Sequence, residues 1–348
     1  TGPDVHRYQL VRWWREQGHE VVTLSPDQNP LAEVRPKGPV TFLRSLRWAD
    51  VVYLRPNERP DAVTRLTLWP QRWLIPKQCA VMWEQNRAIT RSLSMNSRTK
   101  DQIKEDVAVF RRAARRVDAA FGVSQQVSDE LRTLLGLKHV FTIQNGSDPE
   151  MFRPDVEPMP GFARGQTRLQ VAWTGSLAGA RHGYRLIQGL SQEIDQRALR
   201  IDIHVFGATA ELFPKPRPAC LQIHGPVSYF DLPRYLAGID VGLVVYDGRT
   251  DGQSPLKLFD FMASGCVPVC TEGQPIEEVV RHKCEGLVKE WTPDTLADAL
   301  DTLQKNSQIR LMMSKAARSR LLQAYTWQRV AERASDLMTS AVERRRGS

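Results

Sequence analysis

A repeated alternation of short apolar runs with segments of helical period constrains the fold most strongly. The run Ile239–Tyr246 is almost entirely apolar, which is typical of a strand buried on both faces of a parallel sheet. Comparable runs occur at Ala119–Val123 and Leu169–Thr174, and a helical pattern follows each of them. Parallel strands need crossover connections, which are usually helices. The sequence therefore predicts an α/β protein.

The alternation occurs twice, on either side of residues 151–167, which are rich in Pro and Gly and have little periodicity. A chain of 348 residues is long enough for two domains of ordinary size. We expect an N-terminal Rossmann-like domain over 1–150, an interdomain linker over 151–167 and a C-terminal Rossmann-like domain over 168–325. A last helix, 326–348, is expected to pack back toward the N-terminal domain.

The start of the chain is unusual for such a domain. A helical pattern runs from about His6 to Gln17, and the strand-like run Val21–Leu24 follows it. In a parallel α/β domain, a strand and a glycine-bearing turn normally precede the first helix. We therefore expect that the first N-terminal strand is missing from this sequence and that Gly2 is what remains of the turn.

Composition narrows the class of protein. No apolar stretch approaches the roughly 18 residues that a membrane-spanning helix needs, and the five cysteines form no CxxC pair. We expect reduced cysteines, no metal site and a cytoplasmic location. The net charge of +9 falls mainly in the first 150 residues, where Trp13 and Trp14 lie between arginines. This pattern fits peripheral contact with an anionic membrane or with nucleic acid; the alternative is a solvated face with the tryptophans turned to the core.

One short segment has the signals of a helix that binds an anion. Ser254 is a good N-cap, Pro255 suits the first helical position, and Gly265 suits the position after the helix. Lys257 lies in the first turn, where a cation is unfavourable for the helix dipole, so it indicates an external negative charge such as a phosphate. Asp260 follows on the same face, and an exposed Lys257–Asp260 pair is the alternative.

Five motifs follow one another along nearly the whole chain. They are Gly18-His19-Glu20-Val21-Val22, Glu84-x-Asn86, Gln144-Asn145-Gly146-Ser147-Asp148 with Phe152-Arg153-Pro154, Gly175-Ser176-Leu177 with His182-Gly183, and Ser254–Gly265. Together they resemble the glycosyltransferases of family 4, which are retaining, nucleotide-sugar-dependent enzymes of the GT-B fold. The resemblance implies two Rossmann-like domains that face each other across a cleft.

The resemblance also implies roles for individual residues. The C-terminal domain would hold the sugar donor, with Lys257 neutralising its diphosphate and Asp260 accepting hydrogen bonds from the ribose hydroxyls. Backbone N–H groups at Leu256 would add donors, and Gly175 would approach the phosphates through its backbone. The other implied donor-site residues are Ser176, His182, Gly183, Ser254 and Pro255. The N-terminal domain would hold the acceptor, and the candidates there are Gly2, Glu84 and Asn86.

The sequence departs from the family at one carboxylate. The first glutamate of the family's Glu-x7-Glu pattern falls at Gly252, and Asp251 beside it is the candidate that replaces it as a catalytic group. No cofactor and no metal is expected, and the donor substrate is a nucleotide-diphosphate sugar. The acceptor would be a saccharide, a lipid-linked or a small-molecule hydroxyl, and nucleic acid is not expected as a partner.

Two other functions stay open from the sequence. A GT-B-like sugar-nucleotide epimerase would bind the same donor without transferring the sugar. A non-catalytic protein that binds a polyanion or a membrane surface would explain the basic N-terminal half, and it would not respond to nucleotides.

Overall fold

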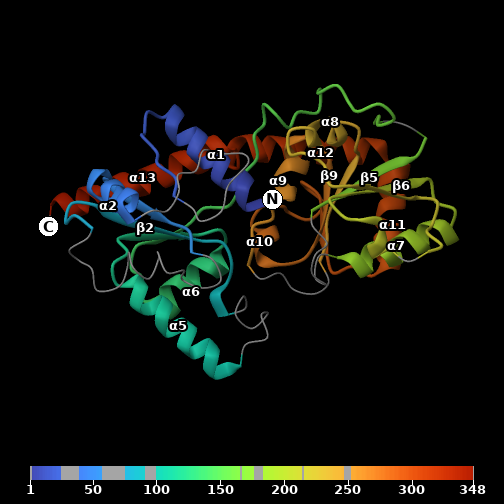
Figure 1. The fold of residues 1–348 in the computed structure, drawn as a ribbon. Helices are drawn as coiled ribbons and strands as arrows, with labels where there is room; N and C mark the ends of the chain where they lie inside the picture. Colours follow the sequence, from blue (N-terminus) through green and yellow to red (C-terminus); the bar gives the residue numbers. More distant parts are fainter. Residues whose placement is uncertain are drawn as a thin grey trace. The chain divides into compact units, whose positions relative to one another are not determined.

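The computed structural model describes residues 2–24, 39–56, 75–90, 99–164, 167–175, 183–213, 215–246 and 252–347. The chain forms two compact units (Figure 1). The first unit comprises residues 1–145, 251–254 and 327–348, and the second comprises residues 146–250 and 255–326. The predicted fold of two Rossmann-like domains is confirmed, because each unit is built on a parallel sheet.

The first unit contains a four-stranded parallel sheet of order β1-β2-β3-β4. Its strands are β1 (Val51–Leu54), β2 (Ala80–Gln85), β3 (Ala119–Gly122) and β4 (Val140–Thr142). The helices among its described residues are α1 (Gly2–Glu16), α2 (Pro39–Trp48), α5 (Lys100–Ala114), α6 (Gln125–Leu135) and α13 (Trp327–Arg346). Every residue of β2 and β3 is buried, as expected for central parallel strands.

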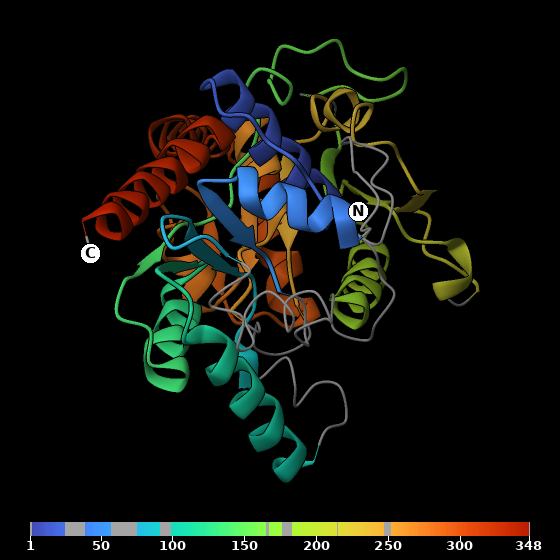
Figure 2. The same cartoon turned by 60° about the vertical axis from the view of Figure 1, so that its left-hand side comes forward.

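Helices cover both faces of this sheet. Helices α1 and α13 lie side by side on one face, and α5 and α6 lie on the other (Figures 1 and 2). The indole Nε1 of Trp14 in α1 donates to the carbonyl of Ala331 in α13, at 3.3 Å. Ser124 caps α6 through a hydrogen bond from the backbone N–H of Val127, as its sequence position predicts.

The second unit contains a six-stranded parallel sheet of order β10-β9-β8-β5-β6-β7. Its strands are β5 (Leu169–Thr174), β6 (Ile201–Phe206), β7 (Leu221–Gly225), β8 (Val241–Val244), β9 (Val267–Thr271) and β10 (Leu287–Lys289). Its helices are α7 (Tyr184–Gln196), the 3₁₀ turn Ala210–Leu212, α8 (Leu232–Leu236), α9 (Leu256–Ala263), α10 (Gln274–Glu277), α11 (Pro293–Lys305) and α12 (Ser307–Ala324). The strand order reverses between β5 and β8, which is the position where doubly wound sheets bind ligands.

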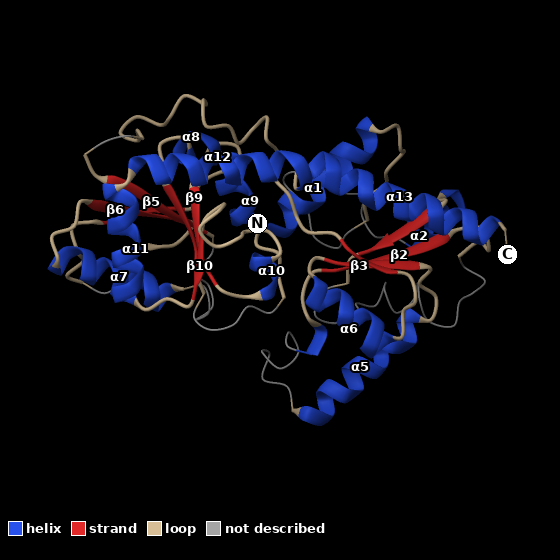
Figure 3. Cartoon of the chain, turned by 180° about the vertical axis from the view of Figure 1, so that it is seen from behind, coloured by secondary structure: helices blue, strands red, loops and turns tan. Residues whose placement is uncertain are grey.

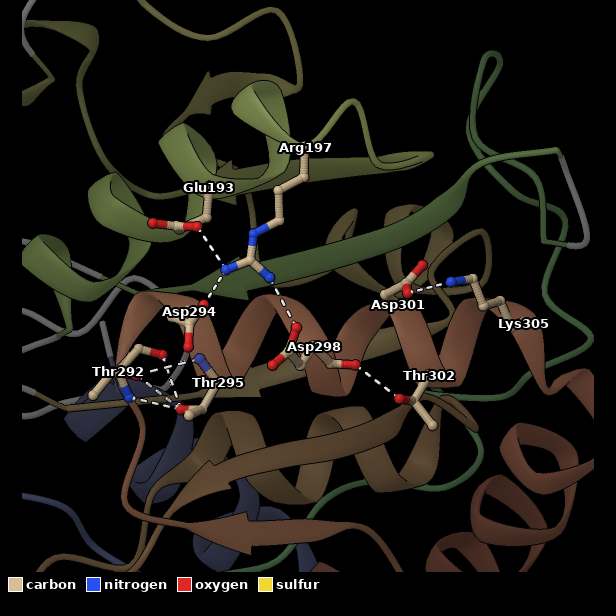
Figure 4. A network of polar contacts seen from close by, with 9 residues as sticks. All are labelled: Glu193, Arg197, Thr292, Asp294, Thr295, Asp298, Asp301, Thr302 and Lys305. Atoms are coloured by element: carbon tan, nitrogen blue, oxygen red, sulfur yellow. Dashed lines mark hydrogen bonds and ion pairs between the residues drawn. The ribbon is translucent and has the colours of Figure 1, made fainter.

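Two hydrophobic cores cover the faces of this second sheet. Helices α7 and α11 pack against one face, and α9 and α12 pack against the other (Figure 3). On the first face, Arg197 at the end of α7 binds Glu193 and reaches Asp294 and Asp298 of α11 (Figure 4). Such solvent-exposed pairs contribute little individually, so the buried side chains hold the two helices together.

Several predicted elements differ in the structure. Val21–Leu24, expected as a strand, has no strand conformation over residues 21–23, and Leu24 makes a single bridge. Strands β7 and β10 were not predicted. Residues 151–164, expected as a linker, pack into the second unit: Phe152 is fully buried, and Arg164 donates to the carbonyls of Ile239 and Ser264.

Candidate functional site

Gly175, directly after β5, lies beside the start of the helix that follows β8, at the reversal of strand order in the second unit. Gly175 directly follows β5 with a φ of 136°. A Cβ placed on Gly175 would lie 3.5 Å from the Nζ atom of Lys257, which belongs to the first turn of α9. The structure therefore brings together two of the residues that the sequence assigned to phosphate binding, at the place in the sheet where a ligand is expected.

Aromatic rings hold the amine of Lys257. Its Nζ lies 3.9 Å from the centre of the Trp173 ring and 5.8 Å from that of Tyr246. Within the described residues, no carboxylate lies within ion-pairing distance of this amine. Burial lowers the pKa of Lys257 to about 7, because removal from water disfavours its charged form. The alternative of an exposed Lys257–Asp260 ion pair is therefore wrong.

Glycines allow the backbone to approach closely around this turn. A Cβ on Gly207, which follows β6, would lie 2.4 Å from the carbonyl oxygen of Gly175. A Cβ on Gly183, which precedes α7, would lie 2.6 Å from the carbonyl oxygen of Val245. Both glycines also have positive φ values, of 89° and 73°. A larger residue at position 207 would displace Gly175, which faces Lys257, and one at position 183 would displace Val245.

Asp260 lies one turn after Lys257 in α9 but has a different partner. Its Oδ1 accepts a hydrogen bond of 2.6 Å from the hydroxyl of Ser147, and the residue is 8% exposed. Burial raises the pKa of Asp260 to about 7, and the charge of Asp148 acts in the same direction, while the Ser147 hydrogen bond opposes them. The carboxyl group is therefore held in place and is partly protonated near neutral pH.

The start of α9 differs from the prediction. The helix begins at Leu256, and Pro255 is the N-cap because its ψ of 118° is extended. Ser254 does not cap the helix, since its hydroxyl donates to Gln144 Oε1 at 2.8 Å and accepts from the backbone N–H of Asn145 at 3.1 Å. No side-chain cap closes the N-terminus of α9. The N–H of Leu258 already donates to the carbonyl of Pro255, so Leu256 and Lys257 carry the N–H groups at this end that lack an intrahelical acceptor. Gly265 follows the helix with a φ of 74°, as predicted.

A buried charge cluster surrounds Glu84 in the first unit. Glu84 ends β2 and is fully buried. Its Oε1 lies 2.9 Å from His6 Nε2 and 3.3 Å from Arg55 Nε, and its Oε2 accepts a 2.5 Å hydrogen bond from the Tyr53 hydroxyl. Burial alone would raise the pKa of Glu84, but Arg55, His6 and Tyr53 lower it to about 2. Burial and the charge of Arg55 lower the pKa of His6, which favours neutral imidazole.

The other acceptor candidates lie at less constrained positions. Asn86 follows β2 and is partly exposed, and its side chain makes no hydrogen bond to the described residues. Gly2 is the first residue of α1. Three residues predicted for the site, Ser176, His182 and Asp251, lie outside the described residues.

Two residues of this site were not found from the sequence. Trp173 belongs to an apolar strand pattern, which indicates only a core residue, and Tyr246 ends another such pattern. Their rings nevertheless lie beside Lys257. The signal that could have found them is their position at the carboxyl ends of the two strands between which the order reverses.

Two features are absent from the part of the chain that the structure describes. No helix there is long and apolar enough to cross a membrane. No group of three or more His, Cys, Asp or Glu side chains there could hold a metal ion.

The chain is similar to known proteins in part of its sequence and in its structure. Residues 181–336 match a family model described as glycosyl transferase-like. No curated protein matches the sequence. The chain is similar to the structure of HepE from Anabaena in complex with UDP and glucose, with a TM-score of 0.72 and 13% identity over 98% of this chain and 96% of that one. It is also similar to a glycosyltransferase of Rickettsia africae, with a TM-score of 0.70 and 11% identity over 98% and 95% of the two chains.

A third similar structure is the sucrose-phosphate synthase of Thermosynechococcus elongatus, with a TM-score of 0.69 and 13% identity over 95% of this chain and 91% of that one. At these identities the likeness establishes the fold, which is the GT-B fold of two Rossmann-like domains. The glycosyl transferase-like match, taken with this fold, supports a glycosyltransferase.

Proposed function

We propose that the protein is a retaining, metal-independent glycosyltransferase of family 4 that moves a sugar from a nucleotide-diphosphate sugar to a hydroxyl acceptor. The observation that carries this proposal is the Lys257 amine, which has no carboxylate partner among the described residues and lies beside the Gly175 backbone. A diphosphate leaving group gains negative charge as the glycosidic bond breaks. A fixed cation and helix N–H groups stabilise the transition state where that charge develops.

The donor belongs to the second unit in this proposal. Lys257 and the N-terminus of α9, beginning at Leu256, bind the diphosphate, and the Gly175 turn approaches it through the backbone. Asp260, held by Ser147, accepts hydrogen bonds from the ribose hydroxyls. UDP is the first nucleotide to test, because the similar HepE structure contains UDP and glucose. Ser176, His182, Gly183 and Asp251 stay predicted members of this site.

The acceptor belongs to the first unit in this proposal, near Glu84 and Asn86. Glu84 is fully buried and engaged, so it acts by holding Arg55 and His6 in position. Asn86 is the group available to an acceptor hydroxyl. We propose no enzyme nucleophile: the acceptor attacks from the face of the leaving phosphate, and a phosphate oxygen helps to remove its proton. A saccharide or lipid-linked acceptor and a cytoplasmic location stay predictions.

A thermal-shift screen over nucleoside diphosphates and their sugars tests this function, followed by product analysis with the donor that binds. We expect one nucleotide to raise the melting temperature by mass action and its sugar to be transferred or slowly hydrolysed in the presence of a chelator. Epimerised donor without transfer would favour the epimerase. No shift with any nucleoside diphosphate would overturn the donor-site assignment.

A further inference from the structure

A second basic site lies in the first unit, at the opposite end of the sheet from Glu84. It is a pocket of about 460 Å³ where α5, α6 and α13 end. Its lining includes Ala119, the first residue of β3, and His139, which precedes β4. Glu84 lies at the carboxyl end of β2, and the strands are parallel. The pocket is therefore separate from the proposed acceptor residues.

The cations of this pocket outnumber its carboxylates. Its one carboxylate, Asp118, is already engaged: it pairs with Arg345 at 2.5 Å and accepts a 2.8 Å hydrogen bond from the backbone N–H of Val81. The other permanent cations are Arg115, Lys138 and Arg344. All three are exposed, and none forms a hydrogen bond or ion pair through its side chain with the described residues.

The favourable interaction of cations with helix C-termini does not explain why these three side chains lie around one pocket. A cation near a helix C-terminus contributes only about 0.3–1 kcal/mol to helix stability. At two of the helix ends, backbone N–H groups already donate to carbonyls of the last turn. The N–H of Gly136 donates to the carbonyl of Arg132 after α6, and the N–H of Val117 donates to that of Ala114 after α5. Three exposed cations around one pocket repel each other weakly in water, and an anion between them would replace that repulsion with attraction.

We propose that this pocket binds a phosphate-bearing anion through Arg115, Lys138 and Arg344, with His139 at its edge. Guanidinium groups recognise phosphate oxygens in pairs, and a lysine adds a point charge. The pocket is larger than one phosphate needs, so a diphosphate or a phospholipid headgroup fits this chemistry. The site is additional to the proposed donor site, because all its residues belong to the first unit.

The test uses inorganic pyrophosphate in calorimetric titrations at low ionic strength, where exposed charges are poorly screened. All proteins carry Lys257→Ala, which removes the diphosphate contact proposed for the second unit. The pocket variant is Arg115→Ala/Lys138→Ala/Arg344→Ala. The matched control is Arg44→Ala/Arg47→Ala/Lys100→Ala, which removes the same charge from exposed positions of the same unit.

We expect the pocket variant to bind pyrophosphate at least about tenfold more weakly than its parent, and the control to stay within about twofold of it. Cosedimentation with phosphatidylcholine vesicles, with and without phosphatidylglycerol, forms the second arm. Binding to the anionic vesicles alone, lost in the pocket variant, would identify a lipid headgroup as the ligand. Equal losses in the pocket and control variants, or no binding in either arm, would overturn the proposal. Unchanged melting temperatures establish that the variants fold.

Discussion

The Nζ atom of Lys257 lies 3.9 Å from the centre of the Trp173 ring, so an amine at the start of α9 rests on an aromatic face at the end of β5. The ring attracts the ammonium through its quadrupole and limits where the amine can move. It does not neutralise the charge as a carboxylate would. This arrangement holds the amine in place, so the charge that it carries when protonated is available to an anionic ligand.

Substitution of Trp173 tests this positioning. The variant Trp173→Phe keeps a smaller aromatic face, whereas Trp173→Leu removes it. We expect UDP binding to weaken in the order wild type, Phe, Leu, with a loss of about 0.5–2 kcal/mol for Leu. Calorimetric titration measures the affinities. Equal affinities for the Phe and Leu variants would indicate that the ring acts only by packing.

Proton uptake on binding tests the state of Lys257. Burial lowers the pKa of Lys257 to about 7, and a bound diphosphate favours its charged form. At about pH 8 the amine is mostly neutral in the free protein, so UDP binding should take up close to one proton, and affinity should fall as pH rises above 7. Calorimetry in two buffers of different ionisation enthalpy measures this uptake. The variant Lys257→Arg stays charged, so it should bind without uptake.

Two glycines form a matched pair for testing the turn at Gly175. A Cβ on Gly207 would lie 2.4 Å from the carbonyl oxygen of Gly175, whereas one on Gly225 would meet nothing within 4 Å. Both have positive φ, of 89° and 70°. We expect Gly225→Ala to cost only the backbone strain, about 1–2 kcal/mol of stability. Gly207→Ala should also weaken UDP binding by at least about tenfold, because it displaces the turn. Equal UDP affinities for both variants would contradict this.

The buried cluster around Glu84 predicts a large loss of stability on substitution. Glu84→Gln removes a fully buried carboxylate that lies beside His6 and Arg55, and we expect the free energy of unfolding to fall by about 3–5 kcal/mol. The control, Glu16→Gln, breaks an exposed pair with Arg12 and should cost less than about 1 kcal/mol. Denaturant unfolding measures both. A cost as small as that of the control would mean that the cluster is not an ion pair.

The same cluster has a defined pH dependence. The pKa of Glu84 is lowered to about 2 from its ordinary value of 4.5. The stabilisation that its carboxylate provides is therefore present above pH 4.5 and is lost as the pH falls toward 2. Between pH 4.5 and 2, the free energy of unfolding of the wild type should therefore fall more steeply than that of Glu84→Gln.

Local signals in the sequence predicted much of the fold. The bounds of β5 follow directly from an apolar run, and the hydroxyls of Ser124 and Thr292 cap α6 and α11 by accepting hydrogen bonds from the N–H groups of Val127 and Thr295. Strand β7 was missed because it is only partly buried and contains polar residues, and β10 was missed because it has only three residues. The start of α9 was misplaced because Gln144, distant in the sequence, engages the hydroxyl of Ser254.

The site could be predicted only where a residue contradicted its local pattern. Lys257 was found because a cation is unusual in the first turn of a helix. Trp173 fits its strand as a core residue, so nothing local distinguishes it. The partners of Glu84 were also missed, since His6 and Tyr53 are brought to it from distant segments by the fold.

The most direct measurement compares the binding of UDP and uridine to wild type and to Lys257→Met by calorimetric titration. Methionine keeps much of the length and packing of the side chain and removes the charge. If Lys257 is the phosphate clamp, UDP affinity falls by about tenfold or more in Lys257→Met, and uridine affinity stays the same. An unchanged UDP affinity, or equal losses for UDP and uridine, would contradict the account.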